Sequence, residues 1–135
     1  MEATAKLKGY PKSERKMRLI ADLVRGKSVD EAMGILKHHK KDASRVISKL
    51  LVSAIANWED KLNQMYDAAE YDLKIYEIFV DGGSMLKRFR PAPHGRAHRI
   101  RKRTCHVTLR IKNTVPLEDE KENSGQEMVA EENDQ

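Results

Sequence analysis

Positively charged side chains dominate one stretch of the chain, "MLKRFRPAPHGRAHRIRKR", which spans residues 85–103. Eight of its nineteen residues are Lys or Arg, and no Asp or Glu occurs between positions 84 and 110. Arginine carries a planar, permanently charged guanidinium group that pairs with phosphate through two hydrogen bonds and also stacks on bases. The stretch therefore predicts an element that binds RNA.

The basic side chains that we expect to contact RNA form two sets. The first lies in this stretch and comprises Lys87, Arg88, Arg90, Arg96, Arg99, Arg101, Lys102 and Arg103. The second surrounds the start of the first expected helix, whose free amide groups also attract phosphate, and comprises Lys6, Lys8, Lys12, Arg15, Lys16 and Arg18. Two separate basic sets suggest contact with more than one RNA segment, and the alternative is a solvated charged surface.

Histidine and cysteine side chains give no comparable signal for catalysis or metal binding. His94 and His98 stand four positions apart, but the proline and glycine that flank His94 disfavour the helix that would bring them together. Cys105 and His106 are neighbours in an expected strand, so their side chains point to opposite faces. No glycine-rich phosphate loop precedes a helix. We expect no catalytic residue, no metal and no cofactor.

The composition indicates one small domain with a basic body. Of the 135 residues, 39% are apolar and 35% are charged, which is enough for a single modest core. The net charge of +5 combines −7 for residues 113–135 with +12 for the rest. No apolar run approaches the roughly 20 residues that span a bilayer. "MEATAKLKGY" does not look like a signal peptide, and the single cysteine fits a reducing, cytoplasmic location in a bacterium.

Apolar residues at helical spacing predict three helices at about 14–25, 28–37 and 43–62. Gly26 is the expected left-handed stop of the first, Ser28 and Glu31 form a capping box at the second, and Asp42 is the expected cap of the third. Strands are expected at 73–81 and 104–111, with a weaker one at 3–9. The fold class is therefore α+β, with three helices packed on a small antiparallel three-stranded sheet.

Residues 82–103 connect the two strong strands and are expected to form a long protruding β-hairpin that turns near 91–95. The alternative is a tight turn at Asp81-Gly82, but Lys87 and Arg88 break the apolar alternation that it needs. "DGGS" at 81–84 is interpreted as a flexible pivot. Residues 1–112 would then form one RNA-binding domain, and residues 113–135 an acidic, disordered, solubilising tail. A second interpretation is that the tail screens the basic hairpin before its partner arrives.

Six segments, taken in their order and spacing, resemble the bacterial uL22 family of large-ribosomal-subunit proteins over about residues 5–112. They are "KMRLIADLVRGKSVDEAMGIL", "SAIANWE", "IFVD", "LKRFRP", "GRAHRIRKRT" and "HVTLRI". The resemblance implies a structural, non-catalytic subunit component that binds large-subunit ribosomal RNA, touches neighbouring ribosomal proteins and supports assembly.

The resemblance also implies that the hairpin tip lines the nascent-peptide exit tunnel and meets the nascent peptide there. By position, the tip consists of Pro91, Ala92, Pro93, His94, Gly95 and Arg96. Many family members carry Pro-Arg-Ala-Lys-Gly-Arg at this place, so Ala92 and His94 replace two permanent charges.

Three other functions compete with the ribosomal one. A non-ribosomal RNA-binding or RNA-chaperone protein would share the basic surfaces. A membrane-surface protein would need a basic amphipathic helix, whereas the cations here lie on a hairpin. An RNA-modifying enzyme would need a protected pocket with an acid, a base or a metal. We expect neither a membrane nor a small-molecule substrate as partner.

Overall fold

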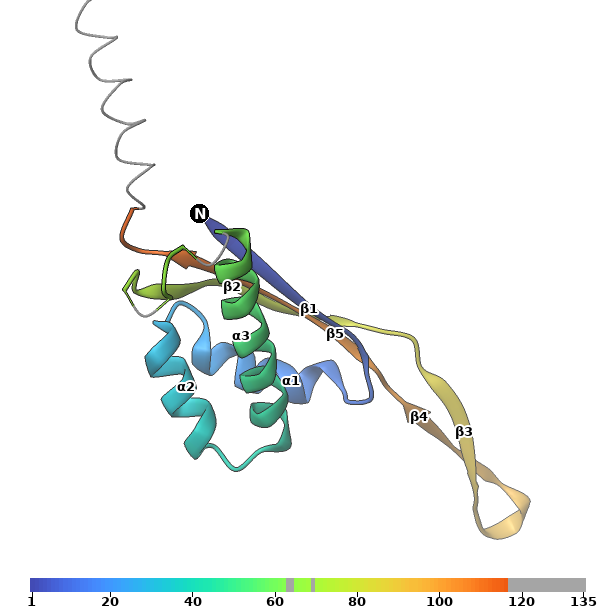
Figure 1. Cartoon of the computed structure of the whole chain (residues 1–135). Coiled ribbons are helices and arrows are strands. Elements are labelled where there is room, and N and C mark those ends of the chain that lie inside the picture. Colours follow the sequence, from blue (N-terminus) through green and yellow to red (C-terminus); the bar gives the residue numbers. More distant parts are fainter. Residues whose placement is uncertain (63–64, 69, 117–135) are drawn as a thin grey trace, which may run out of the picture.

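In the computed structural model, one strand precedes a block of three helices, and the remaining strands follow that block (Figure 1). The structure describes residues 1–62, 65–68 and 70–116. The strands are β1 (Glu2–Tyr10), β2 (Leu73–Gly82), β3 (Leu86–Pro91), β4 (Ala97–Lys102) and β5 (Cys105–Asn113). The helices are α1 (Glu14–Val24), α2 (Val29–His38), α3 (Asp42–Lys61) and the short 3-10 helix η1 (Pro93–Gly95).

The main sheet is antiparallel with the order β1-β5-β2, so the last strand of the domain lies between the first and the second. Val107, Leu109 and Ile111 of β5 alternate with more exposed residues and are almost completely buried. The expected strands at 73–81 and 104–111 are confirmed. The strand expected to be weak, at 3–9, pairs with β5 from Glu2 opposite Lys112 to Tyr10 opposite Cys105.

All three helices cover the same face of this sheet, with α3 packed on β1 and α1 packed on β2 (Figure 1). The apolar stripes predicted from the spacing supply the helical side of the core, including Met17, Ile20, Ile47 and Trp58. This arrangement confirms the α+β expectation of three helices on a small antiparallel sheet. The opposite sheet face carries the polar side chains of the strands.

Of the predicted helix ends, one is confirmed, one is confirmed in part and one is wrong. Gly26 follows α1 with φ +75°. The Ser28 hydroxyl accepts a hydrogen bond from the Glu31 amide at 3.4 Å, which is one half of the expected capping box, whereas the Glu31 carboxylate accepts a hydrogen bond from Lys27 Nζ at 2.6 Å. Asp42, however, is the first residue of α3 and Lys41 occupies the N-cap position. The Asp42 carboxylate is held by Tyr10 at the end of β1 and by Lys12 in the connection to α1, and it does not cap its own helix.

Beyond the sheet, β3, η1 and β4 form an arm, residues 86–102, that projects away from the body (Figure 1). The alternative tight turn at Asp81-Gly82 is excluded, because both residues belong to β2 and pair with His106 and Cys105. The chain reverses near positions 91–96, as expected. The acidic part of the predicted tail, from residue 117 onward, lies outside the described residues.

Candidate nucleic-acid interface

The arm is a two-stranded ladder without a core of its own. β3 pairs antiparallel with β4 from Leu86 opposite Lys102 to Pro91 opposite Ala97, and every residue of both strands is exposed. An isolated two-stranded hairpin is marginally stable in water at best. Like charges also face each other across the ladder, because Lys87 lies opposite Arg101. An anionic surface around the arm would remove this repulsion.

Both faces of the arm carry cations. Residues paired across a ladder share a face, and consecutive residues alternate between faces. One face therefore presents Lys87, Phe89, Arg99 and Arg101, and the other presents Arg88, Arg90, Ile100 and Lys102. A basic surface on one face only would suit an arm that lies on RNA, whereas cations on both faces suit an arm that is surrounded by it.

Phe89 is a candidate contact that the charge pattern did not identify. Its side chain is 76% exposed, and its cross-strand partner is Arg99. Exposed aromatic rings stack on nucleic-acid bases and contribute about 1–3 kcal/mol per base. The available signal was an aromatic residue between two arginines in a segment that has no core to bury it.

The tip is closed by a hydrogen bond from the Ala92 amide to the Arg96 carbonyl oxygen at 2.8 Å. Between these residues, His94 and Gly95 both adopt left-handed backbone conformations, with φ of 62° and 68°. A positive φ is uncommon for a residue with a side chain. The geometry leaves His94 and Arg96 exposed at the far end of the arm, together with both prolines.

The root of the arm, where it joins the sheet, is hydrogen-bonded. The Gly83 amide donates to the Thr104 carbonyl oxygen at 2.9 Å, and Thr104 Oγ1 donates to the Ser84 carbonyl oxygen at 2.5 Å. A Cβ atom on Gly83 would overlap Thr104 Oγ1. Glycine is therefore needed here for close approach of the two strands. The interpretation of 81–84 as a flexible pivot is corrected accordingly, since half of that segment belongs to β2 and Gly83 is tied across the root.

Four of the six N-terminal cations point into solvent without an ion pair among the described residues. Lys6 and Lys8 lie on β1, and Arg15 and Lys16 lie in the first turn of α1. The Ser13 side chain makes no capping hydrogen bond at the start of α1. These four residues remain available for phosphate.

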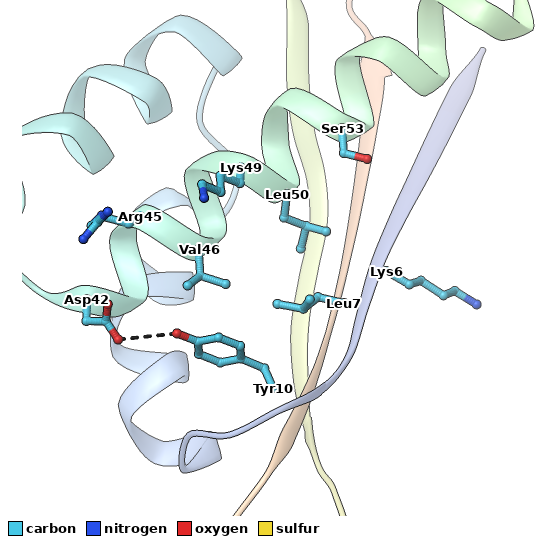
Figure 2. Close-up of a pocket in the computed structure, with 9 residues that line it drawn as sticks. All are labelled: Lys6, Leu7, Tyr10, Asp42, Arg45, Val46, Lys49, Leu50 and Ser53. Carbon is cyan, nitrogen blue, oxygen red and sulfur yellow. Dashed lines mark hydrogen bonds between the residues drawn. The ribbon is translucent and has the colours of Figure 1, made fainter.

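The other two N-terminal cations have partners within the protein. The Lys12 ammonium pairs with the Asp42 carboxylate, which also accepts a hydrogen bond from the Tyr10 hydroxyl at 3.4 Å (Figure 2). The hydrogen bond between Lys12 and Asp42 raises the pKa of Lys12 and lowers the pKa of Asp42. Arg18 donates from Nε and Nη2 to the Val80 carbonyl oxygen at 3.2 and 2.9 Å. Both cations therefore hold α1 to the rest of the domain.

A further basic group does not form one continuous charged segment in the sequence, because it is split between two helices. It lies where α2 ends and α3 begins, and comprises Lys37, Lys40, Lys41, Arg45 and Lys49. The signal was the run "KHHKK" at 37–41, followed by two cations spaced one helical turn apart.

Cys105 and His106 lie on opposite faces of β5, as their neighbouring positions in a strand predicted. Cys105 is buried, and this burial raises the pKa of its thiol. His106 is on the other face of β5, and its Nδ1 atom accepts a hydrogen bond from the Gly9 amide at 2.8 Å. Within residues 1–62, 65–68 and 70–116, no three His, Cys, Asp or Glu side chains are grouped as metal ligands. No helix in the described part of the chain is long and apolar enough to cross a membrane.

Comparison with known families identifies the same region as the sequence resemblance did. The model of the family described as ribosomal protein L22p/L17e matches residues 5–112. This range includes the helical body, the arm and the whole of the paired sheet except the first residues of β1 and the last residue of β5.

Several curated bacterial proteins are similar over most of their length. The large ribosomal subunit protein uL22 of Christiangramia forsetii is 64% identical over 107 residues, which cover 79% of this chain and 78% of that protein. The uL22 protein of Flavobacterium johnsoniae is 60% identical over 107 residues, covering 79% and 77%. The uL22 protein of Bacteroides fragilis is 52% identical over 116 residues, covering 86% and 84%.

Proposed function

Because the chain belongs to the ribosomal protein L22p/L17e family, we propose that it is a structural constituent of the large ribosomal subunit that binds large-subunit ribosomal RNA. The family is one of non-enzymatic ribosomal proteins, so the chain performs no catalysis of its own. Residues 1–112 act as one RNA-binding domain in the cytoplasm, and neighbouring ribosomal proteins are its further partners.

The observation that carries this proposal is the exposure of cations on both faces of a coreless arm. Such an arm gains little from packing within the protein, because each of its twelve strand residues faces solvent. Lys87 and Arg101 share one face of the arm, so phosphates on that face would neutralise both side chains and stabilise the ladder, while phosphates on the opposite face would pair with Arg88, Arg90 and Lys102. The arm therefore inserts between RNA segments. The free N-terminal cations, Lys6, Lys8, Arg15 and Lys16, bind a further RNA segment at the body of the domain.

The tip extends this proposal to the nascent-peptide exit tunnel. Residues 91–96 lie at the end of the arm farthest from the sheet (Figure 1). If the arm is inserted in RNA, its tip reaches an internal surface, and we assign it to the tunnel wall in contact with the nascent peptide. Because Ala92 and His94 carry no permanent charge, this wall carries less permanent charge than an Arg and Lys pair would supply.

Association with the subunit is tested by fractionating a lysate that contains the tagged protein at native expression level. A density gradient at moderate and at high salt is followed by measurement of copies per large-subunit RNA. About one copy at both salt concentrations supports an integral component. Recovery in light fractions contradicts the ribosomal assignment and favours a non-ribosomal RNA-binding or RNA-chaperone protein.

The electrostatic mechanism has a separate test. Neutralising six to eight phosphates gives a slope of about −4 to −7 when the logarithm of RNA affinity is plotted against the logarithm of salt concentration. A slope near −1 would contradict the proposed role of the two basic sets.

A further inference from the structure

The basic group at the α2–α3 corner, defined as Lys37, Lys40, Lys41, Arg45 and Lys49, is exposed and holds five cations against one acid. Between positions 37 and 49 the only acidic residue is Asp42, whose carboxylate is paired with Lys12 and also attracts Arg45. The other acids of these two helices lie at their far ends, at Asp30 and Glu31 of α2 and at Glu59 and Asp60 of α3. The helical layer is thus positive at one end.

This charge is unfavourable for α3 by itself. Lys41, Arg45 and Lys49 follow one another at four-residue spacing, so they form one stripe in which like charges are neighbours. The stripe begins at the N-terminus of a 20-residue helix, where the helix dipole favours negative charge. Ion pairs within the described residues do not involve these three side chains. A stripe of this kind becomes favourable when an anion lies along it.

The surface around the stripe is concave. A cavity of about 790 Å³ lies between α2 and α3, lined by Met33, Lys37 and Lys40 as well as by Arg45 and Lys49.

The same two α3 cations also border a second cavity, of about 560 Å³, between α3 and β1 (Figure 2). Figure 2 shows Val46 and Leu50 pointing toward Tyr10 and Leu7, while Arg45 and Lys49 project from α3 on another side. The two cations therefore form a ridge between the two hollows.

The spacing and the chemistry of the corner favour phosphate over an acidic protein segment. Successive cations of the stripe are about 6 Å apart along the helix axis, comparable with successive phosphates of one nucleic-acid strand. Protein interfaces depend on buried apolar and aromatic anchors. The large apolar side chains that the described residues expose all lie elsewhere, and none falls between positions 37 and 49.

We propose that the α2–α3 corner is a third RNA-binding surface, which holds the phosphates of one RNA strand along the Lys41, Arg45 and Lys49 stripe. The inference rests on the proposed RNA-binding function and adds a site to it. The body then binds RNA on its helical layer as well as through the free N-terminal cations, which lets one small domain join more RNA segments than the arm and its N-terminal set alone.

The test compares three double variants of the full-length chain, using protein-free large-subunit ribosomal RNA as the probe. Arg45→Gln with Lys49→Gln changes the corner, and Arg99→Gln with Arg101→Gln changes the arm. Lys74→Gln with Lys112→Gln is the control, because it removes the same charge from exposed positions on β2 and β5. RNA affinity is measured over a series of KCl concentrations, and circular dichroism checks that each variant is folded.

The corner variant is expected to have a salt slope shallower than that of the parent by about 1.4–1.8, which corresponds to two phosphates at about 0.7–0.9 each. The control is expected to keep the parent slope. Equal changes in the corner and control variants would overturn the inference, because total charge would then explain both.

Failure of the inference differs from failure of the proposed function. If the parent is steep, the arm variant is shallower and the corner variant keeps the parent slope, only the corner site is wrong. A parent slope near −1 would instead reject RNA binding as the function. The corner variant is also fractionated on the density gradient described above. If it keeps its RNA affinity but no longer sediments with the large subunit, the corner binds an acidic protein segment, and the assignment of the corner to RNA is overturned.

Discussion

Lys12, at the start of the connection into α1, forms an ion pair with Asp42, thirty positions later at the start of α3. The pair joins two helix N-termini that the sequence separates by the whole of α1 and α2. It takes one predicted RNA contact, Lys12, and one predicted helix cap, Asp42, and uses both to connect the body of the domain. Two of the residues that the sequence marked for separate roles thus have a shared structural one.

The contribution of this pair to stability is expected to depend on pH. Asp42 has a pKa below its ordinary value of 3.8, so its stabilising effect is complete above that value and is lost as the pH falls through the lower, folded-state pKa. Lys12 has a pKa above 10.5, so its effect is lost only as the pH rises through its raised pKa in alkaline solution. The pair is therefore fully formed near neutral pH.

A double-mutant cycle of Lys12→Gln and Asp42→Asn, with urea unfolding at pH 7 and at acidic pH, measures this effect. We expect a small favourable coupling at pH 7, because the side chains are 28% and 56% exposed. The coupling should shrink as the pH is lowered below 3.8. A coupling that is the same at both pH values would show that the two side chains do not interact as charges.

Gly83→Ala is expected to lower stability by about 1–3 kcal/mol, because the added methyl group would overlap Thr104 Oγ1 at the root of the arm. Gly34→Ala is the matched control. Gly34 lies within α2 in open space, so alanine there should raise stability by about 0.5–1 kcal/mol. Urea unfolding compares the two variants with the parent.

The steric origin of the Gly83 effect can be checked by adding Thr104→Ala. Removing Oγ1 relieves the overlap but also removes the hydrogen bond to the Ser84 carbonyl oxygen. Gly83→Ala should therefore lower stability less when it is added to Thr104→Ala than when it is made in the parent. No recovery would place the cause of the Gly83 effect elsewhere.

Phe89→Ala is expected to weaken RNA binding by about 1–3 kcal/mol if the ring stacks on a base. The salt slope should stay at the parent value, because no charge is removed. The free protein should keep its stability, since Phe89 is 76% exposed. Leu86→Ala is the control, an exposed apolar residue of the same strand without a ring. Equal losses from both variants would argue against stacking.

Arg99→Ala is expected to reduce the salt slope by about 0.7–0.9 and to weaken binding to all RNA sequences, as loss of one phosphate contact does. Val107→Ala should instead change the stability of the folded protein. Val107 is 1% exposed in the central strand, so its truncation should cost roughly 1–3 kcal/mol of stability and leave the slope unchanged. Binding isotherms over a KCl series, with urea unfolding of each variant, separate the two effects.

The helices, the two strong strands and the arm were predictable from the sequence because each depends on a local pattern. Met17, Ile20 and Val24 recur at helical spacing, so the face that they bury follows from three neighbouring turns. The charge of the arm is likewise continuous along the chain, and its turn is marked by prolines and a glycine. The match to a ribosomal family over residues 5–112 agrees with these local patterns.

Only the tertiary structure decided which cations are free and which hold the domain together. Arg15 and Arg18 are equivalent in a charge count, yet Arg18 donates to the carbonyl oxygen of Val80, 62 positions away. The same holds for Gly83, where a side chain would overlap Thr104 in the connection between β4 and β5. Sequence patterns determine what a segment forms, because the interactions within it are local. The partner of a particular side chain depends on how distant segments pack, and no local pattern contains that information.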